Sequence, residues 1–265
     1  RDGAPQYGPS GAPVWSSPTL DVARRRLYVG TGENYSHPAS ARSDAILALD
    51  LATGSILWSY QALAADVWNA ACSAGANCPL NTGPDYDFGA PPVLVKLKNG
   101  KSLLLAGQKS GFVYALDPDK DGAVVWKAKP GRGGIMGGVH WGMTTDGDVL
   151  YAPVSDLSVY PQDAHLPAQS GIHAIDVMTG KGLWSKVLPD TCGKTTWRCS
   201  PGVSAAATLA GGVVFGGSLD GMLRAFSTSD GSVLWSFDTN RVFDAVNGAE
   251  AHGGGIDSSG PVIAG

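Results

Sequence analysis

Residues 45–58 read AILALDLATGSILW: a short apolar run, an Asp, a Thr-Gly turn and a Trp. The same order returns as YALDPDKDGAVVW at 114–126, HAIDVMTGKGLW at 173–184 and RAFSTSDGSVLW at 224–235. In every copy a Gly stands four residues before the Trp, and these tryptophans lie 68, 58 and 51 residues apart: Trp58, Trp126, Trp184 and Trp235. A unit of this size is typical of one blade of a β-propeller with insertions between blades.

An alternating apolar segment precedes each copy of the repeat, as in RRLYVGTG at 25–32 and GDVLYAPV at 147–154. Short alternating strands separated by Gly and Asp turns predict antiparallel meanders. We therefore expect an all-β fold, with residues 1–265 forming one partial propeller domain. Its blades are expected to end near the four repeated tryptophans.

The repeat also predicts how neighbouring blades hold together. The Asp and Thr of each turn can hydrogen-bond the turn backbone, and the Gly supplies a positive φ. The Trp that follows can then lie flat against the next blade and bury on the order of 200 Å² of aromatic surface.

Composition narrows the class of protein. The chain has 265 residues, a formal net charge of −4, 16% charged residues and 37 glycines. Many glycines with few charges fit a turn-rich β protein. We expect no membrane span, because no apolar run is long enough, and no nucleic-acid partner, because the chain lacks a basic patch.

Four cysteines lie in two local pairs, Cys72 with Cys78 and Cys192 with Cys199. Four cysteines allow three connectivities, and the two local pairings close the shortest loops. We predict these two disulfides and hence a periplasmic or secreted location. Zinc ligation and reduced, buried thiols are the competing interpretations.

The repeat A-x-D-x-x-T-G-x-x-x-W resembles the tryptophan-docking motif of eight-bladed quinoprotein alcohol dehydrogenases, which carry pyrroloquinoline quinone (PQQ). Four blades correspond to about half of such a propeller. The segments DVWNAAC, GGVHWG and GGGIDSSGPVIAG are most similar to the polyvinyl alcohol dehydrogenase group. This resemblance implies oxidation of secondary alcohol groups, including those of a polymer, to ketones, with PQQ and Ca²⁺ as cofactors and cytochrome c as electron acceptor.

The resemblance also implies the residues that contact PQQ. Trp15 stands where the family has the indole beneath the quinone ring, and Lys109 stands where a cation reaches the quinone oxygens. His140 and Trp141 replace an Asn-Trp pair on the carboxylate side of the cofactor, where His keeps a hydrogen-bond donor. Other interpretations are a core Trp15 and a solvated Lys109 in a hairpin turn.

Metal ligands and the catalytic base follow from the same resemblance. Glu33 or Asn34 occupies the place of a Ca²⁺ ligand. Asp66 in ADVWN matches the Asp that removes the alcohol proton, and it is expected to contact the metal as well. Asp85 and Asp87 are rivals for that role, since a cysteine-containing insertion precedes them. Alternatively, Asp66 caps a short helix.

Two further functions remain open at the level of sequence. Non-catalytic propellers, such as outer-membrane assembly lipoproteins, use related repeats as protein-binding scaffolds. A hydrolase could pair Asp66 with Asp85 or Asp87. We also expect the remainder of the propeller to lie outside this chain or to come from a second copy, because a half propeller exposes strand edges.

Overall fold

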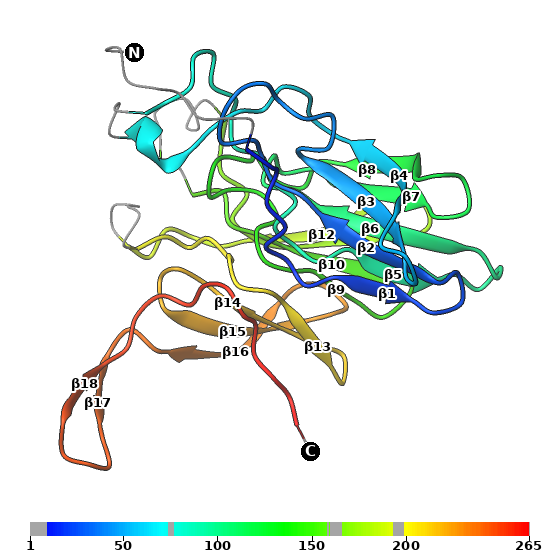
Figure 1. Cartoon of the computed structure of the whole chain (residues 1–265). Coiled ribbons are helices and arrows are strands. Elements are labelled where there is room, and N and C mark those ends of the chain that lie inside the picture. The colour runs from blue at the N-terminus through cyan, green and yellow to red at the C-terminus, as the bar shows by residue number, and fades with distance from the viewer. Residues whose placement is uncertain (1–9, 74–76, 158, 160–165, 193–198, 265) are drawn as a thin grey trace.

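The computed structural model describes residues 10–73, 77–157, 159, 166–192 and 199–264. Four sheets, each of four antiparallel strands, follow one another along the chain (Figure 1). The first sheet comprises β1 (Thr19–Asp21), β2 (Arg26–Gly30), β3 (Ala45–Asp50) and β4 (Ile56–Gln61). The second comprises β5 (Val93–Lys96), β6 (Ser102–Gly107), β7 (Val113–Asp117) and β8 (Ala123–Ala128).

The third sheet comprises β9 (Thr144–Thr145), β10 (Val149–Val154), β11 (Gly171–Asp176) and β12 (Gly182–Val187). The fourth comprises β13 (Thr208–Ala210), β14 (Val213–Gly217), β15 (Met222–Ser227) and β16 (Val233–Asp238). A two-stranded hairpin, β17 (Val242–Asp244) with β18 (Glu250–His252), extends away from the fourth sheet (Figure 1). One short 3₁₀ helix, η1 (Ala70–Ser73), interrupts the loop between the first two sheets.

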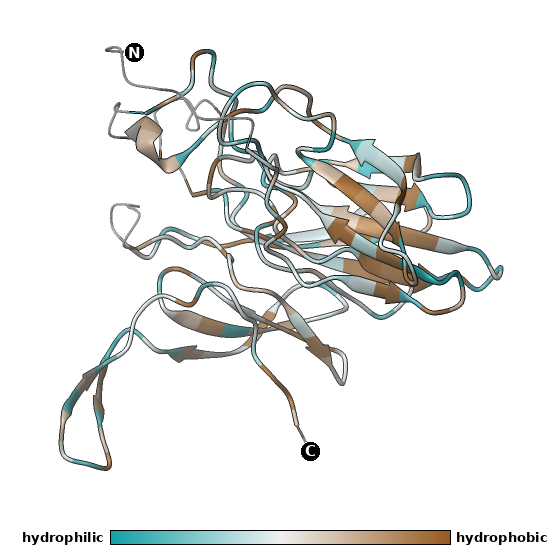
Figure 2. Ribbon diagram, viewed as in Figure 1, coloured by the Kyte–Doolittle hydropathy of each residue, from teal (hydrophilic) through white to brown (hydrophobic). Residues whose placement is uncertain are grey.

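Neighbouring sheets pack face to face, as the blades of a propeller do. Their first strands meet, β1 with β5 and β9 with β13, while the repeated tryptophans lie on their last strands. Strand β6 is buried on both faces: Leu104 and Ala106 pack toward the first sheet, and Leu103 and Leu105 toward the third. Apolar residues accordingly concentrate in the strands (Figure 2). The predicted all-β propeller fold is confirmed.

Each repeated Trp sits directly opposite the small Ala of its own sheet, as in Ala48 with Trp58 and Ala174 with Trp184. In every sheet the register shifts immediately after this Ala, so one residue of the last strand is unpaired. Such a bulge increases the local twist. The small Ala leaves room for the indole on its own sheet.

The next blade's turn glycine covers each of the first three indoles. A Cβ added at Gly122 would collide with the ring of Trp58, and one at Gly180 with the ring of Trp126. Gly231 meets Trp184 in the same way. These glycines have φ near +73°, for example +74° at Gly122 and +73° at Gly180. Glycine is therefore required twice over, for backbone conformation and for close approach.

Hydrogen bonds complete this blade-to-blade contact. Trp126 Nε1 donates to the carbonyl of Val177 at 2.9 Å, and Trp184 Nε1 donates to that of Thr228 at 3.0 Å. Within the turns, Asp176 Oδ1 accepts from both the backbone N–H and the hydroxyl of Thr179. The predicted turn chemistry and the predicted Trp contact are both present.

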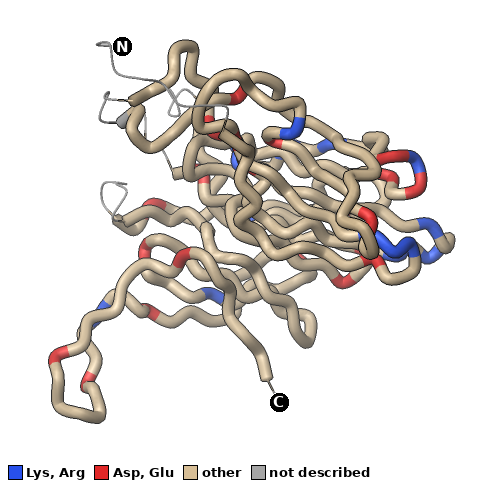
Figure 3. The backbone as a smooth tube through the Cα atoms, viewed as in Figure 1, with Lys and Arg blue, Asp and Glu red and all other residues tan. Residues whose placement is uncertain are grey.

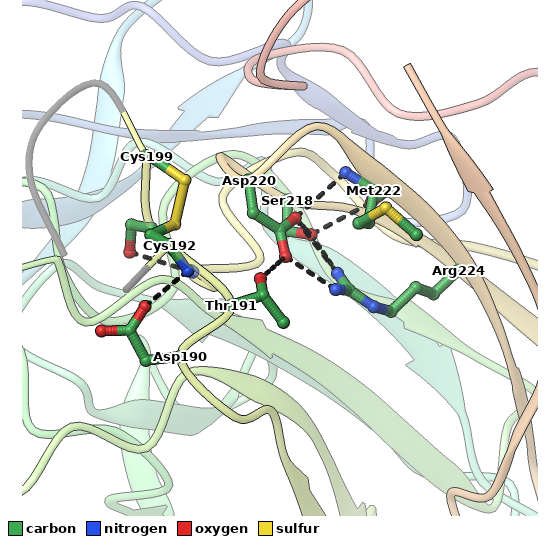
Figure 4. The surroundings of a disulfide bond; sticks show 10 residues. Asp190, Thr191, Cys192, Cys199, Ser218, Asp220, Met222 and Arg224 are labelled. Carbon is green, nitrogen blue, oxygen red and sulfur yellow. Dashed lines mark hydrogen bonds and ion pairs between the residues drawn. A yellow bond between two sulfur atoms is a disulfide. The ribbon is translucent and has the colours of Figure 1, made fainter. Parts of the chain in front are cut away.

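Both predicted disulfides are formed, Cys72–Cys78 and Cys192–Cys199, and the second is drawn in Figure 4. Thr191, beside Cys192, donates to Asp220 of the turn between β14 and β15, so this loop is tied to the fourth sheet (Figure 4).

Acidic and basic residues are interspersed along the chain (Figure 3). No helix in the described part of the chain has the length and apolar character to span a bilayer.

Candidate active site

A cavity of about 900 Å³ opens among loops of the first two sheets, the loop that joins these sheets and the segment before β1. Its floor holds five residues that come from four separate segments of the chain: Trp15, Glu33, Asp85, Asp87 and Lys109. Lys109 follows β6, and Glu33 follows β2. The ends of two middle strands and the loop before β5 therefore converge on one point.

Three buried carboxylates lie close together on this floor, and one lysine pairs with two of them. Oxygen atoms of Glu33, Asp85 and Asp87 all lie within 4.8 Å of one another. Lys109 Nζ lies 3.0 Å from Asp85 Oδ1 and 2.7 Å from Asp87 Oδ2. Lys109 is only 6% exposed, so it is not the solvated turn lysine that was considered as an alternative.

Three carboxylates and one lysine are buried together here, and burial is the largest influence on the carboxyl pKa values. Burial, followed by interaction with Asp87, raises the pKa of Glu33 to about 9. Burial raises the pKa of Asp85 to about 8, although Lys109 opposes the shift. Lys109 and a backbone N–H of Glu33 outweigh burial at Asp87 and hold its pKa below the usual range.

Asp66 lies behind this floor and does not line the cavity. It is 1% exposed, and its two oxygens accept the backbone N–H groups of Asp85, at 3.3 Å, and Tyr86, at 3.0 Å. Gly83 packs so closely on Asp66 that a side chain there would collide with the carboxylate. Asp66 therefore positions the segment that carries the two cavity carboxylates.

The helix-cap interpretation of Asp66 is wrong. The short helix η1 begins at Ala70, and Asn69 caps it by accepting the backbone N–H of Ala71 at 3.0 Å.

Glu33 and Asn34 point to different places. Glu33 lines the cavity, whereas the side chain of Asn34 is fully buried and bonded to backbone. Asn34 Oδ1 accepts the N–H of Ser40 at 2.6 Å, and Nδ2 donates to the carbonyl of Ser10. Because both ends of the amide are occupied, Glu33 is the residue of this pair that is available to a ligand.

Trp15 contributes a half-buried aromatic surface beside the lysine. Lys109 Nζ lies 5.5 Å from the centroid of the Trp15 ring. Trp141 and His140 meet Trp15 edge to face, with ring centroids 4.9 Å and 5.8 Å away. All four residues predicted to contact a planar cofactor are thus brought together, although His140 and Trp141 do not line the cavity itself.

The outer wall of the cavity was not predicted from the sequence. It is made of residues 35–38, 68–70 and 77–80, which are linked by hydrogen bonds. Asn69 Nδ2 donates to the carbonyl of Tyr35 at 3.0 Å, and His37 Nε2 lies 2.7 Å from the carbonyl of Leu80. Cys78 also lines the cavity, so the Cys72–Cys78 disulfide braces this wall. The repeat does not extend over these residues, and the family segment DVWNAAC does not indicate that they form a wall.

Comparison with family models covers almost the whole chain. Residues 109–254 match the family described as outer membrane protein assembly factor BamB, and residues 2–130 match the β-propeller domain of glucose, ethanol and alcohol dehydrogenases. Both are families of PQQ-type repeats. This chain belongs to the PQQ-repeat β-propellers.

Individual relatives point to the dehydrogenase branch. The chain is 40% identical over its whole length to a polyvinylalcohol dehydrogenase of Sphingopyxis sp. (strain 113P3), and 28% identical over 88% of its length to a lupanine 17-hydroxylase [cytochrome c] of Pseudomonas sp.. It spans 41% and 39% of those proteins. The crystal structure of a quinohemoprotein alcohol dehydrogenase from Comamonas testosteroni superimposes with a TM-score of 0.61 at 21% identity, covering 94% of this chain and 42% of that one.

Proposed function

We propose that this chain carries the metal side and the aromatic floor of a PQQ- and Ca²⁺-dependent alcohol dehydrogenase that oxidises secondary alcohol groups to ketones. The observation that supports this most directly is the cluster of Glu33, Asp85 and Asp87 around Lys109, beside the Trp15 ring. The 40% identity to polyvinylalcohol dehydrogenases supports a polymer or long-chain secondary alcohol as substrate.

The carboxylate cluster fits a hard divalent cation. Ca²⁺ prefers carboxylate oxygens, and Glu33, Asp85 and Asp87 offer three that lie within 4.8 Å of one another. Burial is the main cause of the raised pKa values of Glu33 and Asp85, and a bound cation would favour their ionised forms. Glu33 with one of the two aspartates would hold the ion.

The aromatic floor fits a planar quinone. Bound PQQ would accept the hydride of the alcohol, and the indole of Trp15 offers a flat surface for stacking it. Lys109, 5.5 Å above that ring, would stabilise negative charge on an oxygen at the edge of the stacked group. Its pairing with Asp87 and Asp85 raises the pKa of Lys109 against the effect of burial, so the amine stays charged.

The base is best assigned to the Asp85–Asp87 pair. A general base must reach the hydroxyl proton, and these two carboxylates line the cavity whereas Asp66 does not. Asp66 would act indirectly, by fixing the backbone of Asp85 and Tyr86.

The test is reconstitution of the full-length protein with PQQ and Ca²⁺, followed by a dye-linked assay on a secondary alcohol. We expect Asp85→Asn or Asp87→Asn to lower kcat by at least about 100-fold, as loss of general base catalysis does. Asp66→Asn keeps an acceptor and is expected to retain more activity than either. Full turnover in both cavity variants would rule out this assignment of the base.

A protein-binding scaffold is the second candidate, favoured by the BamB family match over residues 109–254. A scaffold does not require three buried carboxylates around a lysine, and burying them is costly. Absence of both PQQ binding and dehydrogenase activity in the full-length protein would favour the scaffold.

We further propose a periplasmic or secreted location, supported by the two disulfides, and a cytochrome c acceptor, which is named for the lupanine relative.

A further inference from the structure

A chain of hydrogen bonds connects His140 with two residues that have no role in the site described above. His140 Nδ1 lies 2.8 Å from Ser204 Oγ, and Ser204 Oγ donates to Asp257 Oδ1 at 2.6 Å. His140 precedes β9, Ser204 precedes β13 and Asp257 follows β18. Three loops from different sheets therefore meet at this chain, which we call the Asp257–Ser204–His140 relay.

The loops that carry the relay are fixed by backbone hydrogen bonds. Ile256 donates to the carbonyl of Ser218 at 3.0 Å, and Ala206 donates to that of Ser258 at 3.1 Å. Ser204 is fully buried, and His140 is 6% exposed. The backbone on both sides of Asp257 is thus held in place, and its exposed side chain reaches Ser204 from there.

Counting hydrogens fixes the form of the imidazole. A hydroxyl has a single hydrogen, and an ionised carboxylate has none to give. Since Ser204 gives its hydrogen to Asp257, it can only accept from His140, so Nδ1 carries a proton. Burial, with Lys109 as a second cause, lowers the pKa of His140 to about 4, so the ring is neutral near neutral pH. A neutral ring protonated at Nδ1 presents Nε2 as a bare acceptor.

Nothing in the described part of the chain donates a hydrogen bond to Nε2. The imidazole ring packs against Trp141, with ring centroids 5.1 Å apart. It lies nearly perpendicular to the Trp15 ring, with centroids 5.8 Å apart. His140 thus offers an acceptor at the border of the aromatic floor. The sequence suggests that His140 offers a donor to the cofactor. The hydrogen count instead makes Nδ1 the donor to Ser204 and leaves Nε2 as an acceptor.

We propose that Ser204 and Asp257 are positioning residues that hold His140 in its Nδ1–H form, so that Nε2 accepts a hydrogen bond from an N–H or O–H group of a planar ligand stacked on Trp15. The identity of that ligand as PQQ rests on the proposed function, whereas the tautomer does not. The order Asp–Ser–His also differs from a hydrolase triad, in which His lies between the other two residues.

The first measurement needs neither cofactor nor activity. Two-dimensional ¹H–¹⁵N spectra of the imidazole nitrogens in the full-length protein report which nitrogen is protonated, and His140→Ala assigns the signals. We expect protonation at Nδ1 in the wild type and a change toward Nε2 protonation in Ser204→Ala, where Nδ1 has lost its acceptor. Wild-type protonation at Nε2, or an unchanged tautomer in Ser204→Ala, would overturn the relay.

The second measurement is the affinity for PQQ, followed by quenching of tryptophan fluorescence. We expect Ser204→Ala and Asp257→Ala to weaken binding about tenfold, the effect of one misdirected hydrogen bond. Asp257→Asn keeps an oxygen acceptor and should stay close to wild type. Ser155→Ala is the matched control, because Ser155 is fully buried and its hydroxyl has no partner in the described structure.

These two measurements separate the possible failures. If the wild type shows the Nδ1–H form but does not bind PQQ, the proposed function fails while the relay stands. If PQQ binds but Ser204→Ala, Asp257→Ala and Ser155→Ala all bind it equally well, the relay does not serve the ligand.

Discussion

Lys109 is the residue on which the charge balance of the site depends. It pairs with Asp85 at 3.0 Å and Asp87 at 2.7 Å in a place where its own exposure is 6%. Removing one partner of a buried ion pair leaves uncompensated charge and costs about 3–5 kcal/mol. We therefore expect Lys109→Met to lower Tm by about 5–10 °C in metal-free buffer.

Added Ca²⁺ should raise the Tm of Lys109→Met by more than it raises the Tm of the wild type, because it supplies the missing positive charge. Thermal unfolding with EDTA and with Ca²⁺ measures both effects. Lys98→Met is the control, since Lys98 pairs with Asp148 at an exposed position and such pairs contribute under about 1 kcal/mol. If Ca²⁺ raises the Tm of neither protein, the cluster is not a metal site.

The residues of the site were only partly predictable from the sequence. Five candidates from the sequence line one cavity: Trp15, Glu33, Asp85, Asp87 and Lys109. The sequence could not show which aspartate faces the cavity, because that depends on backbone conformation. Asp85 has a φ of +60°, and the segment it begins is held by Asp66 through backbone N–H groups. A hydrogen bond between a side chain and a distant backbone leaves no pattern in the sequence.

At the scale of one element, the turn between β14 and β15 is held by a buried ion pair. Arg224 Nη2 lies 2.6 Å from Asp220 Oδ2, and Asp220 Oδ1 also accepts the N–H of Met222 and the hydroxyl of Ser218 (Figure 4). Against the opposing effect of burial, these partners hold the pKa of Asp220 below its ordinary value of 3.8.

This shift predicts a pH dependence of stability. The folded state binds the Asp220 proton more weakly than the unfolded state, so the stabilisation is complete above the ordinary value of 3.8 and is lost as pH falls through the lower folded value. We expect Asp220→Asn to cost about 2 kcal/mol at neutral pH and progressively less toward pH 3. Urea unfolding across this range measures the difference.

Asp244→Asn, at an exposed position of β17, is the control and should show no such trend. If the loss of unfolding free energy in Asp220→Asn does not depend on pH, then shape or hydrogen bonding, rather than charge, stabilises the turn.

Across the whole molecule, the repeat predicted the fold because the same few residues determine the turn, the strand pairing and the packing of blades. The same Asp, Gly and Trp set the turn, the bulged strand and the contact with the next blade. The cavity wall of residues 35–38, 68–70 and 77–80 follows no repeat, since each blade's connecting loops differ. Its hydrogen bonds, such as that from Asn69 to Tyr35, could be found only in three dimensions.

The first and the fourth sheet each expose one half of the Trp–Gly contact that joins neighbouring blades elsewhere. Trp58 and Trp126 are 6% and 9% exposed beneath the next blade's turn, whereas Trp235 is 48% exposed. At the opposite end, no atom of the described residues lies within 4 Å of a Cβ built at Gly54, the position that matches the indole-covering glycines of the later sheets. The face around Trp235 thus has the chemistry of a docking surface for another blade of the same repeat.

This difference predicts unequal costs for equal substitutions. Trp126→Ala should destabilise the chain by about 3–5 kcal/mol, as expected for a buried aromatic residue, and Trp235→Ala by about 1 kcal/mol. In a longer polypeptide that supplies the next blade, the cost of Trp235→Ala should rise toward that of Trp126→Ala, because the indole would then be covered by a turn glycine. Urea unfolding of both proteins makes the comparison. If Trp235→Ala costs the same in the two, a further blade does not dock on this indole, and the propeller must close through other contacts.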